Sequence, residues 1–132
     1  MPLQVELVSP EKVAYSGEAK MVIARVVDGD IAFLPGHVPF VGILQTHPVR
    51  VLLEDGSEEV FAVHQGFVEV SNDAVTVLSD TCELQHDIDV PRAEAALERA
   101  EEALKQDEND ADAAAALNRA QVRLSVAGAV KN

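Results

Sequence analysis

Residues 66–106 read GFVEVSNDAVTVLSDTCELQHDIDVPRAEAALERAEEALKQ, and the hydrophobic period changes within this stretch from that of a strand to that of a helix. In the first part, valines alternate with polar residues on both sides of a polar turn at Asn72 and Asp73, which predicts a β-hairpin. In the last part, apolar residues recur at three- and four-residue steps, which predicts an amphipathic helix. We therefore expect a strand-rich module that ends near residue 88 and a helical module after it.

The strand-rich module has the pattern of many short antiparallel strands. Turn signals separate its apolar runs, such as SG (16–17), PGH (35–37) and EDGS (54–57). This spacing favours a sandwich or a flattened barrel, because sequential strands usually pair and each strand must bury one face. The runs are VELVS (5–9), KMVIARVV (20–27), PVRVLL (48–53), EVFAVH (59–64), FVEV (67–70) and VTVL (75–78).

The helical module predicts two helices in an antiparallel hairpin. Pro91 suits the first turn of a helix, and Asp89 is a suitable N-cap before it. The acidic segment DEND, residues 107–110, separates the first helix from the second. Each helix has one narrow apolar stripe. The stripe residues are Ala93, Ala96, Leu97, Ala100 and Leu104 in the first helix, and Ala113, Ala116, Leu117, Ala120 and Leu124 in the second.

Alanine dominates both stripes, so we expect the hairpin to pack weakly on itself and on the sandwich. Burying a leucine or valine contributes about 1.5–3 kcal/mol, and an alanine contributes much less. Alanine is also the best helix former, so each helix can persist when its packing partner leaves. A stiff, loosely docked hairpin suits a conformational switch, and a plain helical cap is the alternative.

Charge and composition restrict the function classes. The chain has 132 residues and a formal net charge of −13, which repels nucleic-acid phosphates, so we expect no nucleic-acid partner. Its one cysteine, Cys82, excludes an intramolecular disulfide and a multi-cysteine zinc site. The sequence has no targeting leader and no run of 18 apolar residues, so we expect a membrane to be reached only through a partner.

No catalytic motif stands out, so we predict no active site, no metal and no cofactor. The P-loop, nucleophile-elbow, HExxH and Rossmann glycine patterns are absent from the sequence. The four histidines, at positions 37, 47, 64 and 86, lack the spacing of metal ligands.

We expect a rigid apolar loop at DGDIAFLPGHVPF, residues 28–40. Pro35 and Pro39 fix φ, and Gly36 permits a tight bend. His37, in the middle of the loop, either bonds to a partner surface or ties the loop to its own backbone.

In this order of features, the chain resembles the epsilon subunits of F-type ATP synthases over essentially its whole length. The most specific pieces are LPGHVP (34–39) and GFVEVSNDAVTVL (66–78). The resemblance implies an α+β fold, with a ten-stranded antiparallel β-sandwich over residues 1–87 and a regulatory antiparallel α-helical hairpin over residues 88–132.

The resemblance also implies a noncatalytic subunit of the rotary central stalk, without an active site of its own. The sandwich would bind the gamma subunit and sit on the c-ring, which Asp30 and His37 would contact. The extended hairpin would reach the catalytic alpha and beta subunits and inhibit ATP hydrolysis. The subunit would be peripheral, on the cytoplasmic face of the cell membrane.

A second family feature lies at the junction of the modules. Some bacterial members bind ATP through an I/L-D-x-x-R-A motif, which IDVPRA (88–93) matches at every defined position. ATP would be a regulatory ligand that favours the folded hairpin and is not hydrolysed. By resemblance, the ATP contacts are Glu83, Ile88, Asp89, Arg92, Ala93 and Arg99, and Arg123 is a further candidate cation from the second helix.

The junction motif also has a purely structural alternative. Asp89 can be only a helix cap, and Arg92 and Arg99 can pair with glutamates on the helix surface.

Inhibition is expected to be weak or absent. Inhibitory family members have a basic second helix, whereas this one offers only Arg119 and Arg123, with Lys131 at the tail. The rival function is a free-standing nucleotide-binding adaptor with the same two modules, and an enzyme built around His37 is a third.

Overall fold

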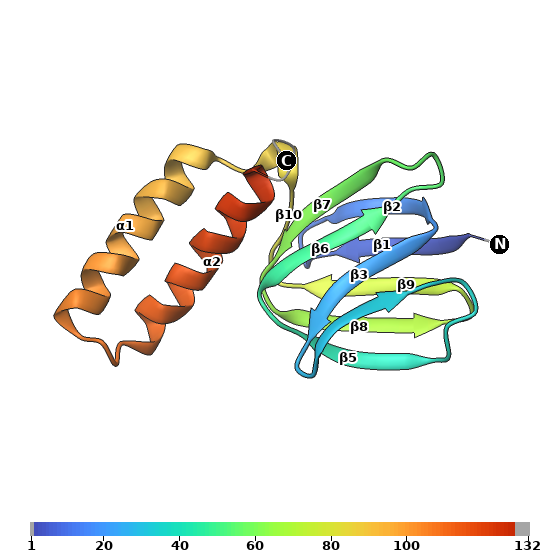
Figure 1. Cartoon of the computed structure of the whole chain (residues 1–132), viewed down its shortest axis with the longest axis horizontal. Coiled ribbons are helices and arrows are strands. Elements are labelled where there is room, and N and C mark those ends of the chain that lie inside the picture. The colour runs from blue at the N-terminus through green and yellow to red at the C-terminus, as the bar shows by residue number, and fades with distance from the viewer. Residues whose placement is uncertain (1, 129–132) are drawn as a thin grey trace.

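The computed structural model describes residues 2–128, which form a sandwich of ten strands followed by a hairpin of two helices (Figure 1). The predicted fold class is therefore confirmed. The strands are β1 (Leu3–Val8), β2 (Val13–Ala19), β3 (Met21–Val26), β4 (Gly29–Phe33), β5 (Phe40–Leu44), β6 (His47–Leu52), β7 (Glu58–Val63), β8 (Gly66–Ser71), β9 (Ala74–Ser79) and β10 (Cys82–Leu84). A short 3-10 turn, η1 (Gln85–Asp87), precedes the helices α1 (Val90–Gln106) and α2 (Ala111–Gly128).

The strands are hydrogen-bonded in the order β10-β7-β6-β3-β5-β8-β9-β1-β2, and β4 pairs with β3 beside this path. Among residues 2–128, every pairing is antiparallel except that of β1 with β9, which is parallel. These two strands are distant in the chain, so no tight turn forces them to run in opposite directions. The parallel pairing places β1 alongside β9, at the edge of the β8–β9 hairpin.

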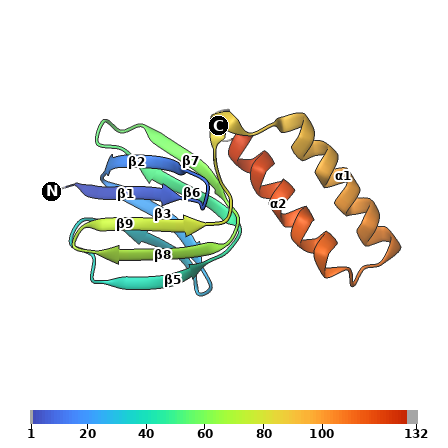
Figure 2. The same cartoon turned by 180° about the vertical axis from the view of Figure 1, so that it is seen from behind.

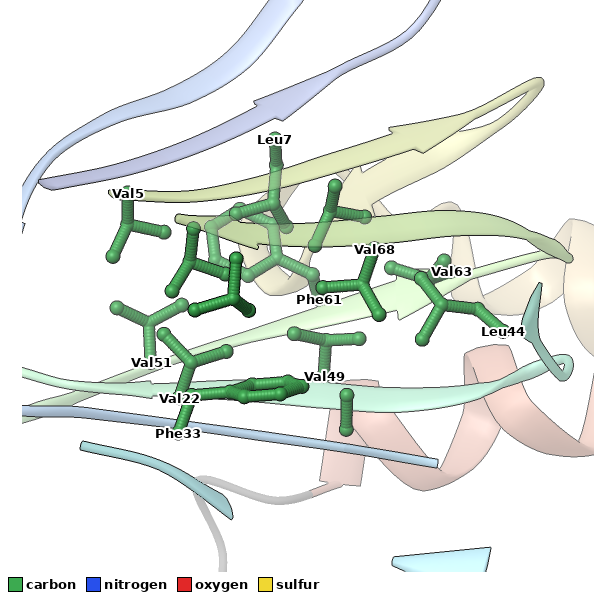
Figure 3. Packing of buried hydrophobic residues seen from close by; sticks show 14 of the residues in the cluster. Val5, Leu7, Val22, Phe33, Leu44, Val49, Val51, Phe61, Val63 and Val68 are labelled. Atoms are coloured by element: carbon green, nitrogen blue, oxygen red, sulfur yellow. The ribbon is translucent and has the colours of Figure 1, made fainter. Parts of the chain in front are cut away.

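The core of the sandwich lies between its two layers (Figure 3). In β1, Leu3, Val5 and Leu7 are buried while Gln4 and Glu6 are exposed, as the alternation of residue types predicts. The largest buried side chains are those of Phe33 and Phe61, and valines fill most of the remaining space. The sandwich thus has a well-packed interior that is separate from the helices.

The turns fix the register of the hairpins. Asn72 and Asp73 both have positive φ, 52° and 61°, and they join β8 to β9 in a two-residue turn, as predicted. At the predicted EDGS turn, the Asp55 carboxylate accepts a 2.8 Å hydrogen bond from the backbone N–H of Ser57. These turns could be predicted from the sequence, because Asn, Asp and Gly adopt positive φ more easily than other residues.

Two predicted non-strand segments are wrong. SG (16–17) lies inside β2, and the loop expected over residues 28–40 is shorter, because Gly29–Phe33 forms β4. The loop itself covers residues 34–39, where Gly36 has a φ of 84° and its N–H donates a 2.7 Å hydrogen bond to the Asp73 carboxylate. Glycines and polar residues hid both strands from a reading of propensity alone.

The helical hairpin contacts the sandwich through one helix. α2 lies beside the sandwich and α1 lies on the outer side, while the N-terminus is at the opposite end of the molecule (Figures 1 and 2). The predicted alanine stripes meet each other, with Ala93, Ala100, Ala113 and Ala120 buried. Within residues 2–128, no helix is both long and apolar enough to cross a bilayer.

A second apolar stripe of α2 faces the sandwich. Val122 and Val126 are buried against Val60 and Ala62 of β7 and against Ile88. None of these side chains is large, so the contact is small compared with the core of the sandwich. Two polar links accompany it: Gln85 donates a 2.7 Å hydrogen bond to the Val126 carbonyl oxygen, and Arg123 bonds to Glu83.

Candidate functional site

A groove of about 330 Å³ lies where β10 meets the first turns of α1 and the last turns of α2. Every residue predicted to bind ATP lines it except Ile88, whose side chain is buried in the apolar contact between hairpin and sandwich. The docked hairpin therefore brings together side chains from the sandwich and from both helices. The lining residues are Glu83, Asp87, Asp89, Arg92, Ala93, Ala96, Arg99 and Arg123.

Three arginines are the cations of the groove, which three carboxylates also line. Arg92 and Arg99 come from α1 and are exposed, whereas Arg123 comes from α2 and is half-buried. Among the described residues, no carboxylate lies within 4.0 Å of the Arg92 or Arg99 guanidinium. In this conformation, Arg92 and Arg99 therefore do not pair with glutamates of their own helix. Guanidinium groups of this kind suit phosphate oxygens.

Glu83 is the central acceptor of the site. Its Oε1 accepts a 2.7 Å hydrogen bond from Arg123 Nε and a 2.9 Å hydrogen bond from His64 Nε2. Burial raises the pKa of Glu83, but the hydrogen bonds and charges of His64 and Arg123 outweigh this effect and lower it overall. Glu83 is therefore a carboxylate at neutral pH, and it joins β10 to α2 and to His64, the residue that follows β7.

Asp89 caps helix α1, as the sequence predicted. Its carboxylate accepts a 3.1 Å hydrogen bond from the backbone N–H of Arg92, and Pro91 occupies the first turn. Asp89 also lines the groove, so the cap and the candidate ligand contact are the same side chain. Its second carboxylate oxygen can still accept a hydrogen bond from a ligand.

Neither a metal site nor a reactive thiol is found in the described part of the chain. No three side chains of His, Cys, Asp or Glu gather there as metal ligands. Cys82 is buried, and burial raises the pKa of its thiol to about 12, so it stays protonated.

Asp30 and His37, the predicted c-ring contacts, lie at opposite ends of β4. Asp30 accepts a 2.8 Å hydrogen bond from Arg25 Nε, which lowers the pKa of Asp30, and it lines a cavity together with Ser125 and Val126 of α2. Asp30 therefore lies at the end that faces the helices. The structure does not bring it together with His37.

His37 lies in the loop at the other end of the sandwich. Its Nδ1 donates a 2.7 Å hydrogen bond to the Val38 carbonyl oxygen, and its ring packs edge-on against Phe33 at 5.1 Å between centroids. His37 thus ties the loop to its own backbone, which was one of the two predicted roles. Leu34 and Val38 beside it are exposed.

An exposed apolar face was not predicted from the sequence. Ile43 pairs with Phe67, and Phe67 pairs with Leu78, so these three side chains form one row across β5, β8 and β9. All three are exposed, as is Val41 two residues before Ile43. Part of the signal was present in the sequence, because apolar residues are adjacent at Ile43-Leu44, Phe67-Val68 and Val77-Leu78, but the pattern did not tell which of the two faces out. We call these four residues the apolar face.

Comparison with known families places the whole described chain in one family. Residues 2–85 match the β-sandwich domain of the ATP synthase delta/epsilon chain, and residues 86–128 match its long α-helix domain. The chain belongs to the ATP synthase delta/epsilon chain family. The family resemblance seen in the sequence is thereby confirmed.

Curated relatives of this delta/epsilon-type chain are named ATP synthase epsilon chain. One from Brevibacillus brevis is 53% identical over 102 residues, which cover 77% of each chain. One from Streptomyces griseus is 44% identical over 122 residues, which cover 92% of each chain. This chain is therefore similar to bacterial epsilon chains in both of its modules.

Solved structures share the fold of this delta/epsilon-type chain at low sequence identity. A chain in the Euglena gracilis mitochondrial ATP synthase structure of OSCP, F1 and c-ring matches with a TM-score of 0.71 and 19% identity, over 98% of this chain and 79% of that one. A chain from the Tetrahymena thermophila central stalk and c-ring matches with a TM-score of 0.54 and 13% identity, over 67% and 71%. These matches concern the fold.

Proposed function

We propose that this chain is a noncatalytic central-stalk subunit of a proton-translocating F-type ATP synthase, and that its hairpin regulates ATP hydrolysis by binding ATP. It acts on the cytoplasmic face of the cell membrane, as a peripheral part of the complex. The observation that carries the regulatory part is the groove, in which the sandwich, the junction after it and both helices contribute three arginines and three carboxylates. The names of the bacterial relatives support the assignment to the complex.

The sandwich offers two surfaces for its partners. The apolar face on β5, β8 and β9 would dock the gamma subunit, because clustered exposed apolar side chains mark interaction sites. The loop 34–39 exposes Leu34 and Val38, and its Gly36 bonds to Asp73 in the β8–β9 turn. This turn lies at the end of the sandwich away from the helices (Figure 1), where the loop would contact the c-ring. Asp30 does not share this end, so we assign the ring contact to the loop and to His37.

ATP in the groove would favour the folded hairpin. Its phosphates would bridge Arg92 and Arg99 of α1 and Arg123 of α2, while Glu83 and Asp89 would accept hydrogen bonds from the adenine amino group or the ribose. A ligand that contacts all three elements binds the docked state better than the extended state, and it shifts the population accordingly. The groove volume, about 330 Å³, lies within the range of ligand pockets, roughly 300–1,000 Å³.

In the extended form, the hairpin would reach the catalytic alpha and beta subunits. The cations of α2 among the described residues are Arg119 and Arg123, and Lys131 lies outside that part of the chain. Arg123 is engaged with Glu83 in the docked state. Few basic groups are thus available to acidic surfaces, so the inhibition would be weak or absent.

The test of the nucleotide site is a calorimetric titration of the purified chain with ATP. Arg92→Ala and Arg99→Ala should each weaken binding by about tenfold, because each removes a charge-assisted hydrogen bond. Arg119→Ala is the matched control, since Arg119 is on α2 but does not line the groove. Equal affinities for all four proteins, or no binding at all, would contradict the site.

The stalk assignment is tested by copurification with the gamma subunit and the c-ring. Ile43→Ser on the apolar face should abolish gamma binding, whereas Val13→Ser on β2 should not, although Ile43 and Val13 are similarly exposed, at 57% and 56%. If the wild-type chain binds ATP but neither partner, the rival function, a free-standing nucleotide-binding adaptor, is correct.

A further inference from the structure

His64 is a buried polar residue that no sequence motif singled out. Its side chain is 4% exposed and its Nε2 lies 2.9 Å from Glu83 Oε1. Because a carboxylate oxygen only accepts, Nε2 carries the proton and donates. The other ring nitrogen, Nδ1, is buried without a hydrogen-bond partner among residues 2–128. Burying an unpaired polar atom is costly, and a sheet position of this kind is usually apolar.

The sheet register directs His64 toward the groove. Glu83 pairs with Ala62, and His64 follows Ala62 by two residues, one residue beyond the end of β7. The alternation of side chains therefore places all three on one face. On that face, Val60 and Ala62 contact α2. The backbone of His64 is fixed by its 3.1 Å hydrogen bond to the Thr81 carbonyl oxygen. His64 therefore acts from the rigid sandwich, whereas Arg123 acts from the hairpin.

Both hydrogen bonds to the Glu83 side chain end on the same oxygen, Oε1. This arrangement leaves Oε2 as the acceptor for a ligand in the groove. Arg123, however, has two candidate partners, Glu83 and a phosphate group. A phosphate that draws Arg123 away would leave His64 as the remaining donor that orients the carboxylate.

We propose that His64 is a positioning residue of the nucleotide groove, which holds the Glu83 carboxylate toward the ligand when Arg123 turns to the phosphates. This inference rests on the proposed binding of ATP. It assigns to His64 no contact with the ligand itself. The effect of His64 on ATP binding depends entirely on Glu83, so it should disappear when Glu83 is replaced.

The experiment is an ATP titration of four single variants and one double variant of the full chain. His64→Leu should weaken binding by about tenfold, because it removes the donor to a charged acceptor. His64→Gln should stay within about threefold of the wild type, since its amide nitrogen can reach Glu83. In a Glu83→Gln background, His64→Leu should change the affinity by less than about twofold, because coupled residues are not additive.

Val63→Ala is the control for a merely structural role. Val63 is a fully buried neighbour in the core, so this change lowers stability without touching Glu83, and it should leave the ATP affinity of the folded protein unchanged. If His64→Leu does not fold, His64→Asn replaces it, because its shorter side chain falls short of Glu83.

The outcomes separate this inference from the proposed function. Unchanged binding by His64→Leu, with a wild type that binds ATP, overturns the inference alone. If His64→Leu lowers the ATP affinity equally in the Glu83→Gln background, the inference is overturned as well. The same holds if Val63→Ala also lowers the ATP affinity, because the effect would then not depend on Glu83. A wild type that does not bind ATP overturns the nucleotide site and this inference together.

Discussion

Arg123 on α2 donates a 2.7 Å hydrogen bond from Nε to Oε1 of Glu83 on β10, forty residues earlier in the chain. This ion pair joins the last strand of the sandwich to the last helix of the hairpin. The two side chains are about one quarter exposed, 26% for Glu83 and 27% for Arg123, so water screens their interaction only in part. Both side chains also line the candidate nucleotide groove.

We predict that Arg123→Gln loosens the hairpin without unfolding the sandwich. The change removes one of the polar links between the two modules, at a cost of about 1–2 kcal/mol in docking free energy. Hydrogen exchange of backbone amides in residues 111–128 should become faster, while exchange in the strands stays the same. Arg119→Gln, on the same helix but outside the ion pair, is the control, and equal exchange in both variants would argue against a docking role.

We predict an acid-dependent contribution of Glu83 to stability. The pKa of Glu83 is lowered in the folded protein, so its contribution is fully present above the unfolded-state pKa of about 4.3 and is lost as the pH falls through the lower folded-state value. In urea unfolding, the difference in stability between wild type and Glu83→Gln should therefore be constant near neutral pH and shrink below about pH 4.3. A difference that does not change down to pH 3 would contradict this assignment.

We predict that Gly66→Ala severely destabilises the sandwich. Gly66 has a φ of 151°, and a Cβ at this position would collide with the backbone carbonyl oxygen of Leu78 on the paired strand β9. Neither backbone can move without breaking the ladder, so we expect a loss of about 3 kcal/mol or more, measured by chemical denaturation. Gly56→Ala is the matched control: its φ is also positive, 89°, but its surroundings are open. It should cost only about 1–2 kcal/mol, and a similar loss in both variants would mean that the collision is relieved.

We predict that the two roles of Asp89 can be separated by substitution. Asp89→Ser keeps an N-cap acceptor for the Arg92 N–H, whereas Asp89→Ala removes it and should destabilise α1 by about 1 kcal/mol. Both variants lack the carboxylate that lines the groove, so both should bind ATP more weakly if Asp89 contacts the ligand. Thermal unfolding measures the first effect and ATP titration the second. A serine variant that binds ATP as tightly as the wild type would leave Asp89 as a cap only.

The fold was largely predictable because its determinants are local. The alternation of valines located most of the strands, and the Asn72-Asp73 turn located the β8–β9 hairpin, whose two turn residues have positive φ. β2, β4, β5 and β10 were not among the predicted runs, and in β2 and β4 glycine and polar residues interrupt the apolar pattern. Both pair along nearly their full length with a neighbour, so tertiary hydrogen bonds compensate for their weak propensity.

The candidate site was predictable in its residues but not in its geometry. The junction motif and the arginines were named from the sequence, and the structure brings all of them except Ile88 into one groove. Ile88 is the first residue of the motif, yet its side chain is buried against Val122 and Val126. No local signal indicated His64, because its partner Glu83 lies on another strand, nineteen residues away.

Local sequence patterns were enough to locate most of the strands and both helices, the start of α1, and the family that the chain resembles. These properties depend on the period of apolar residues and on turn and cap chemistry, which act over a few neighbouring residues. The folded chain was needed to show that β1 runs parallel to β9, that Asp30 and His37 lie apart, and that Arg123 and His64 share one oxygen of Glu83. A hydrophobic period shows which face of an element is apolar, but not which distant element covers it, because that depends on how the sheet closes and where the hairpin docks.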